Sequence, residues 1–202
     1  MLKVELVDKQ LIPYGIKNAI NGTRTCYDSF NKSDSQGVYI GIEDEGLLKK
    51  IIKAGHHTPF EFINLTFTVK NLTRAILQEL ARHRTQVLNV KSTRYTLKRM
   101  KSDVLNNLSK YFYTDLPFYE EYLNMIIEFI NERNLWTLPN DKLKFYFPES
   151  LYCDLQLNMN FRNFINFYKL RSSDKAHFLI RDLTNQMHNE LPELLRELID
   201  LS

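Results

Sequence analysis

This 202-residue sequence has little cysteine and no long apolar segment. Its two cysteines, Cys26 and Cys153, form no Cys-x-x-Cys or Cys/His spacing, so we expect two free thiols in a reducing compartment and no metal site. No stretch is long and apolar enough to span a bilayer, and residues 1–5 lack the apolar run of a secretory signal. The sequence therefore predicts a cytoplasmic protein with no membrane partner.

Charge of either sign is also modest. Lysine and arginine number 27 and acidic residues 24, and this net charge of +3 favours anionic ligands without requiring nucleic acid as a partner. A chain of this length with 44% hydrophobic residues can bury one core. No repeat, low-complexity tract or linker divides it, so we predict a single domain over residues 1–202.

Hydrophobic periodicity predicts both strands and helices. Strict alternation indicates strands at residues 2–7 and 63–69. Helical spacing predicts helices over 15–22 (ended by Gly22), 42–54 (ended by Gly55), from the N-cap Thr73 to the Arg82-His83-Arg84 triplet, 116–133, 142–147, 158–170, and from a cap at Asp174 to 198 with a break at Pro192. Residues 55–61 are expected to form a turn because Pro59 disfavours helix before it. This mixture predicts an α+β fold.

Residues 82–95 hold an unusual density of hydrogen-bond donors. Arg82, His83, Arg84 and Arg94 lie within thirteen residues, with asparagine and serine between them and a tyrosine directly after. The arginine fork suits phosphate and carboxylate, and histidine can exchange a proton. The composition predicts a site for an anionic heteroaromatic ligand, although charge alone favours a solvated basic loop.

Two further polar clusters lie outside this stretch. The first comprises His56, His57, Thr58 and Glu61, and its simplest interpretation is a turn with incidental histidines. The second comprises Asn160, Arg162, Asn166 and Arg171. Arg162 and Asn166 share a helix face, and no acidic residue occurs from 155 to 173 to pair with it. We therefore expect an anionic ligand or a subunit interface there rather than a surface salt-bridge face.

Together, the three clusters resemble the motifs of flavin-dependent thymidylate synthases, the ThyX family. Arg82-His83-Arg84 followed by seven residues and Ser92 is similar to the family signature, and Asn89 and Arg94-Tyr95 extend the match. Residues 56–61 and 160–171 resemble the upstream and C-terminal motifs, so the likeness runs from residue 1 to about 190. It implies a mixed or antiparallel sheet flanked by helices, and a homotetramer with active sites between subunits.

The resemblance also implies a reaction. The family converts dUMP to dTMP with carbon from methylenetetrahydrofolate, hydride from reduced FAD and NADPH as reductant. By position, FAD would be held by Thr58, Glu61, Arg82, His83, Arg84, Asn89, Val90, Asn160, Arg162 and Asn166. The nucleotide would be held by Glu79, Arg82, Lys91, Ser92, Thr93, Arg94, Lys144 and Arg171. His56 and Tyr95 would lie on the folate side, and Arg171 and Ser92 would be catalytic, with the Arg171 cation stabilising charge that develops on the uracil ring.

Several positions depart from the family pattern. Val87, Val90, Glu79 and Lys144 stand where the family usually has serine, glutamate, glutamine and arginine. These changes leave open a related enzyme, a pyrimidine nucleotide hydroxymethylase or a methylase of another nucleotide. A third hypothesis, from a different class, is a nucleic-acid-binding module on residues 82–101, although aromatic residues are sparse there. Neither cysteine has a basic neighbour in sequence, so we do not expect attack by a thiol on the pyrimidine.

Overall fold

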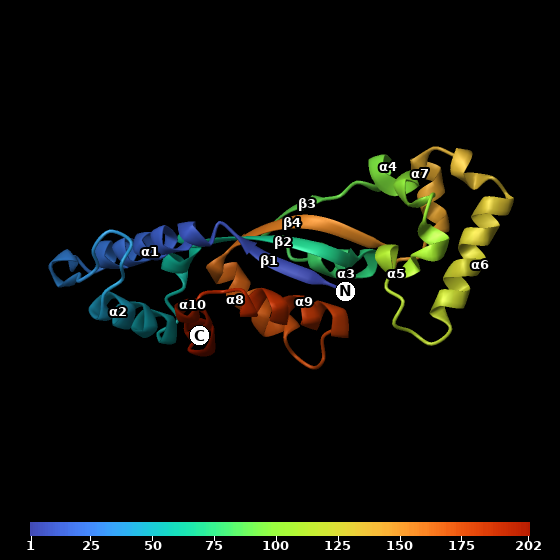
Figure 1. Cartoon of the computed structure of the whole chain (residues 1–202). Helices are drawn as coiled ribbons and strands as arrows, with labels where there is room; N and C mark the ends of the chain where they lie inside the picture. Colours follow the sequence, from blue (N-terminus) through green and yellow to red (C-terminus); the bar gives the residue numbers. More distant parts are fainter. The chain divides into compact units, whose positions relative to one another are not determined.

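A computed structural model describes all residues, 1–202, and divides them into two compact units. Unit 1 comprises Met1–Lys3, Val69–Arg82 and Asn89–Leu155, and unit 2 comprises Val4–Thr68, His83–Leu88 and Gln156–Ser202. The strands form one antiparallel sheet in the order β1 (Lys3–Val7), β2 (Asn64–Thr73), β4 (Tyr152–Asn160), β3 (Val87–Val90) (Figure 1). The predicted α+β class with an antiparallel sheet is confirmed. No helix is both long enough and apolar enough to cross a membrane.

Ten α-helices and several 3₁₀ turns accompany the sheet. The α-helices are α1 (Ile12–Cys26), α2 (Ile42–Lys53), α3 (Arg74–Ala81), α4 (Thr93–Thr96), α5 (Leu108–Tyr111), α6 (Tyr119–Glu132), α7 (Asn140–Leu143), α8 (Phe161–Arg171), α9 (Phe178–Asn189) and α10 (Glu193–Asp200). The 3₁₀ turns are η1 (Lys9–Leu11), η2 (Phe30–Lys32), η3 (Thr58–Phe62), η4 (Leu97–Met100), η5 (Val104–Asn106), η6 (Leu135–Thr137) and η7 (Lys144–Tyr146). The turn expected over 55–61 is therefore partly a 3₁₀ helix.

In both long strands, buried apolar residues alternate with more exposed ones. In β2, Leu65, Phe67 and Val69 are fully buried, as the period of two predicts. In β4, Leu155 and Met159 are buried in the same alternation, so the predicted helical start at residue 158 was wrong by three residues. Strand character continues there because the apolar period stays at two until residue 160. Neither β4 nor the short strand β3 was predicted.

Helix α1 in unit 2 is longer than predicted, because its glycines allow close packing and do not end the helix. The prediction that Gly22 ends the helix was wrong, since α1 continues to Cys26. A Cβ added to Gly15 would lie 3.1 Å from the Ile63 Cα, and one added to Gly22 would lie 3.2 Å from the Phe62 ring. These two residues let α1 approach η3 and the residue before β2 closely. They therefore determine the packing distance between α1 and this segment.

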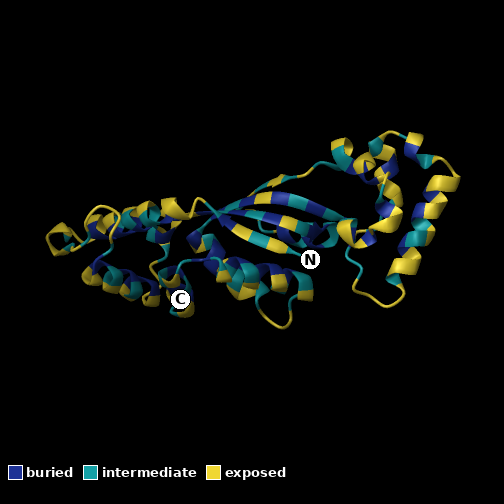
Figure 2. Cartoon of the chain, viewed as in Figure 1, coloured by how far each residue is buried: buried dark blue, intermediate teal, exposed yellow.

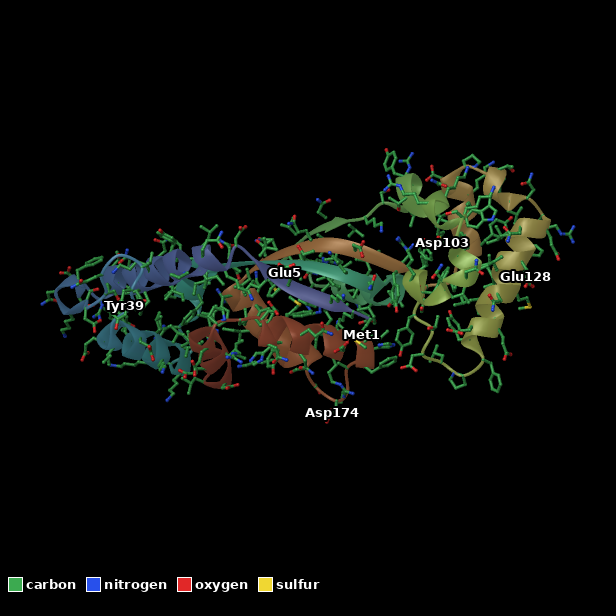
Figure 3. All side chains as sticks on the ribbon, viewed as in Figure 1. Met1, Glu5, Tyr39, Asp103, Glu128 and Asp174 are labelled. Carbon is green, nitrogen blue, oxygen red and sulfur yellow. The ribbon has the colours of Figure 1, made fainter.

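The C-terminal helices of unit 2 begin at a different cap from the one predicted. His177 caps α9 by accepting a hydrogen bond at Nδ1 from the Leu179 N–H, 3.2 Å away. Asp174, the predicted cap, lies on the loop before α9 (Figure 3) and pairs with Arg181 at 2.8 Å. The predicted break at Pro192 is confirmed between α9 and α10.

Unit 1 has its own apolar core. The buried face of α6 presents Leu123, Ile127 and Ile130 to a cluster that includes Trp136, while Glu128 points outward (Figures 2 and 3). The helix predicted over 116–133 is confirmed, with its start three residues later. The predicted Thr73 cap is confirmed as well, because its hydroxyl accepts from the Ile76 N–H.

Candidate functional site

Helix α8 organises the candidate residues of unit 2. Asn160 caps it, since its Oδ1 accepts from the Asn163 N–H at 2.9 Å. This leaves the Asn160 Nδ2 amide available to a ligand. Asn163 in turn donates from Nδ2 to the Thr85 carbonyl at 3.2 Å, which fixes the chain after the arginine triplet to the first turn of α8. Motifs that lie far apart in sequence therefore meet on one helix.

Arg162 and Glu61 form an ion pair that joins η3 to α8. The Arg162 Nη1 donates to the Glu61 Oε1, and both side chains remain about half exposed. The expectation that this basic face lacks an acidic partner was wrong, because the partner comes from 101 residues earlier. An exposed pair of this kind contributes little to stability, and both groups keep polar atoms open to a ligand.

His83 is anchored at the other end of α8. Its Nε2 accepts a hydrogen bond from the Arg171 Nε at 2.9 Å. Its ring stands edge-on to the buried Phe167, with centroids 4.9 Å apart and planes at 86°. Because Nε2 is the acceptor, the ring proton of the neutral imidazole is on Nδ1. His83 therefore orients the Arg171 guanidinium.

The two neighbouring histidines face different parts of unit 2. His57 has its pKa lowered by partial burial and by the positive charges of Lys169 and Arg162. The imidazole is therefore neutral around pH 7 beside the basic face of α8. His56 instead lines a cavity of about 570 Å³ between α1 and α2. Thr58, Arg84 and Asn166 have exposed side chains with no hydrogen bond to the rest of the chain.

Unit 1 gathers a second group of candidate residues around a cavity of about 310 Å³. Thr93 and Lys144 line it, as do Arg74 and Gln78 of α3. The half-buried Arg74 guanidinium has no acidic partner, and Gln78 donates to Glu149 on the cavity wall. An unpaired arginine and lysine at one concave site suit a phosphate.

Two other cations of unit 1 are already neutralised. Lys91 pairs with Asp154 at 3.1 Å, and Arg94 pairs with Asp141 at 3.1 Å. Figure 1 shows α4, which carries Arg94, beside α7. These pairs reduce the free positive charge between residues 82 and 101, so they weaken the hypothesis of a nucleic-acid-binding module.

The remaining candidates of unit 1 differ in exposure. Glu79 lies 3.9 Å from Arg82 one turn along the chain, so its carboxylate faces a cation. Ser92 is half-buried at the start of α4, where its carbonyl accepts from the Tyr95 N–H. Asn89 and Tyr95 are exposed, and Val90 is half-buried.

Comparison with known proteins assigns the family. A family model described as thymidylate synthase complementing protein matches residues 5–195. A flavin-dependent thymidylate synthase of Campylobacter jejuni is 37% identical over 185 residues, covering 86% of each chain, and one of Wolinella succinogenes is 35% identical over 190 residues, covering 89% of this chain and 90% of the relative. The chain belongs to the flavin-dependent thymidylate synthase family. The crystal structure of Helicobacter pylori thymidylate synthase X with FAD and dUMP superposes with a TM-score of 0.82 at 28% identity, covering 100% of this chain and 99% of that one.

For an enzyme of the flavin-dependent thymidylate synthase family, Arg74 is the candidate that reading the sequence missed. It occupies the first turn of α3, directly after the Thr73 cap. A cation is disfavoured there by the helix dipole, which prefers acidic residues at that end. An arginine placed against this preference was the signal in the sequence that could have marked Arg74 as a candidate ligand-binding residue.

Proposed function

We propose that this enzyme methylates dUMP to dTMP, with FAD as the bound cofactor, methylenetetrahydrofolate as carbon donor and NADPH as reductant. The observation that carries the proposal is the meeting of three motifs on α8. The Glu61–Arg162 and His83–Arg171 contacts join the upstream motif, the arginine triplet and the C-terminal motif. Membership of the flavin-dependent thymidylate synthase family supports the reaction.

The donor set of unit 2 fits FAD. Its pyrophosphate calls for guanidinium groups, which Arg84 and Arg162 offer at exposed positions. Its ring edges call for amides, which the free Nδ2 of Asn160 and the exposed Asn166 provide. When bound, FAD supplies the hydride. We assign the same role in cofactor binding to Thr58, Glu61, Arg82, His83, Asn89 and Val90.

Arg171 is the residue to which we assign the main catalytic role. Its Nε is occupied by His83, which fixes the direction of the guanidinium plane. The guanidinium would lie beside the uracil ring, and its fixed positive charge would stabilise the negative charge that develops as C5 acts as the carbon nucleophile. The neutral tautomer of His83 adds no second positive charge.

Unit 1 would hold the nucleotide phosphate. Arg74 and Lys144 supply positive charge at one cavity, and Thr93 adds a hydroxyl. Ser92 and Arg94, at the start of α4, would hold the sugar and phosphate, with Lys91 and Arg82 nearby in sequence. Glu79 is close enough to Arg82 to be compensated rather than to repel the phosphate. His56 and Tyr95 would lie on the folate side.

We further propose one folding domain over residues 1–202 and assembly as a homotetramer. Strands β1, β2 and β4 each contribute residues to both units, which supports a single cooperative domain. An exposed apolar stripe on α6 supports self-association: Phe118, Tyr122, Met125 and Phe129 are 43–80% exposed at helical spacing. Light scattering of the purified protein tests the tetramer, and a single unfolding transition tests the domain.

The visible spectrum of the purified protein, followed by titration with dUMP, tests the proposal. We expect a flavin band that shifts when dUMP binds, and a product heavier than dUMP by one methyl group. Protein that cannot be loaded with FAD would exclude a flavin mechanism. A flavin band that dUMP leaves unchanged would exclude dUMP as the substrate.

A second candidate is an enzyme of the same fold with altered chemistry, such as a pyrimidine nucleotide hydroxymethylase. It is motivated by Val87, which is 68% exposed where the family usually has a serine hydroxyl, and by Val90. Mass spectrometry of the product separates the two candidates, because hydroxymethyl and methyl adducts differ by one oxygen. Methylase activity on another nucleotide would appear as turnover with that nucleotide in place of dUMP.

A further inference from the structure

In unit 2, His56 lines a cavity that is large enough to hold a ligand. It measures about 570 Å³ and lies between the C-terminal end of α1 and helix α2. Leu47 and Ile51 of α2 give it an apolar floor, and the 58%-exposed Tyr27 stands on its wall. An aromatic ring can pack on such a surface.

The cavity continues as a groove along α2. A second cavity of about 360 Å³ shares Arg24, Lys32, Leu47 and Lys50 with the first, so the two are continuous. Helix α2 has 12 residues and is therefore about 18 Å long. We call this feature the α1–α2 groove. Its length suits an extended ligand rather than a compact one.

Two lysines give the groove its charge. Lys32 and Lys50 are exposed and form no ion pair within the chain. The third basic residue, Arg24, is neutralised by Asp44 at 2.6 Å, and the one acidic residue that lines the groove, Glu43, is confined to the second cavity. The middle of the groove therefore attracts carboxylates.

Arg24 also preforms the groove. Its Nη1 donates to the Ser29 carbonyl at 3.4 Å and its Nη2 to the Lys32 carbonyl at 3.1 Å. Because Arg24 is only 4% exposed and Asp44 is fully buried, the backbone that carries Lys32 is tied to the core of unit 2. A ligand that binds there does not have to order this loop first.

We propose that the α1–α2 groove binds the benzoyl-glutamate end of the folate co-substrate, with further glutamyl carboxylates at Lys50 and Lys32. The inference rests on the proposed function, in which His56 lies on the folate side. The benzoyl ring packs on the apolar floor beside Tyr27. A chain of several glutamates follows α2 and places its carboxylates against the two unpaired ammonium groups.

Binding of p-aminobenzoyl-glutamate and p-aminobenzoyl-pentaglutamate to the FAD-loaded protein, measured by calorimetry, tests the groove without turnover. We expect the pentaglutamate to bind at least about threefold more tightly, because each exposed ion pair adds a few-fold in affinity. In the double variant Lys32→Ala/Lys50→Ala this preference should disappear. Lys53→Ala is the matched control, since Lys53 is exposed on the same helix but does not line the groove.

Equal binding of the two probes to the wild-type protein, or an equal loss in Lys53→Ala, would overturn the inference. A kinetic arm compares KM for methylenetetrahydrofolate carrying one or five glutamates. We expect a lower KM for the longer form, and a smaller ratio in the double variant. A protein that forms no dTMP would refute the proposed function, whereas normal turnover without a length preference would refute the groove alone.

Discussion

Replacement of Asp44 by asparagine tests how unit 2 holds its N-terminal helices together. Asp44 is fully buried in α2, and its Oδ1 accepts from the Arg24 Nε at 2.9 Å and Nη2 at 2.6 Å. Its Oδ2 accepts from the hydroxyls of Ser33 and Ser35, each at 2.6 Å. Asparagine keeps the shape of this side chain and removes its charge. The variant therefore leaves the Arg24 cation buried without a counter-ion.

The magnitude follows from the pKa of Asp44. Burial acts to raise this pKa, but the hydrogen bonds from Ser33, Ser35 and Arg24 outweigh burial and lower it from 3.8 to about 2. This lowering corresponds to about 2 kcal/mol of folding stability. Breaking a buried ion pair typically costs about 3–5 kcal/mol because the partner is stranded. We expect Asp44→Asn to lose about 2–4 kcal/mol at pH 7.

The pH dependence gives a second check on the same variant. A carboxylate with a lowered folded pKa stabilises fully above its unfolded pKa, and this stabilisation is lost as pH falls through the folded value. The free-energy difference from wild type, measured by urea denaturation, should therefore be constant from pH 5 to 8 and fall to about half by pH 3. Asp174→Asn is the control, because Asp174 forms an ion pair of similar length with Arg181 but is fully exposed. Its replacement should leave the free energy of unfolding nearly unchanged. A loss below about 1 kcal/mol in Asp44→Asn, or a difference that changes near pH 6, would refute the reasoning.

Four further predictions concern the site and the two cysteines. Arg171→Ala should retain FAD, measured as flavin absorbance per protein, and abolish dTMP formation; undiminished turnover would remove Arg171 from catalysis. Arg74→Ala should raise KM for dUMP about tenfold or more without changing flavin content, because it removes a charged hydrogen-bonding group, and an unchanged KM would exclude a phosphate role. Iodoacetamide should label the exposed Cys26 in the native protein and leave Cys153 unmodified, since burial raises the pKa of Cys153 to about 11. The double alanine variant at both cysteines should remain active, and complete loss of turnover would indicate a thiol mechanism.

Much of the fold could be predicted from local pattern. The alternation from Ile63 to Val69 predicts β2 because one strand face is buried, and the apolar spacing of α2 and α6 predicts their buried faces. The same signal was present in β4, where Cys153, Leu155 and Leu157 alternate with polar residues. The helical pattern of α8 begins directly after residue 160 and hides this alternation, so the sequence predicts a helix from residue 158 instead of a strand.

The contacts that assemble the site could not be predicted in this way. Glu61 pairs with Arg162 across 101 residues, and His83 receives the Arg171 hydrogen bond across 88. No acidic residue lies near Arg162 in the sequence, so the sequence alone predicts an unpaired basic face on α8. Gly22 is a similar case. A glycine that ends a helix cannot be distinguished in the sequence from a glycine that leaves room for a neighbouring ring, and only the structure shows the Phe62 ring against Gly22.

The close approach at Gly15 makes this position sensitive to substitution. A methyl group there would press on the Ile63 Cα and on the Phe62 carbonyl, 3.2 Å away, and so would displace the end of η3 next to Glu61. Under the proposed role of Glu61 in holding FAD, Gly15→Ala would weaken FAD affinity although Gly15 is not itself a proposed ligand-binding residue. Because stabilisation by a ligand grows with the logarithm of its concentration relative to its dissociation constant, the variant would gain less stability from a given concentration of FAD than the wild-type protein does.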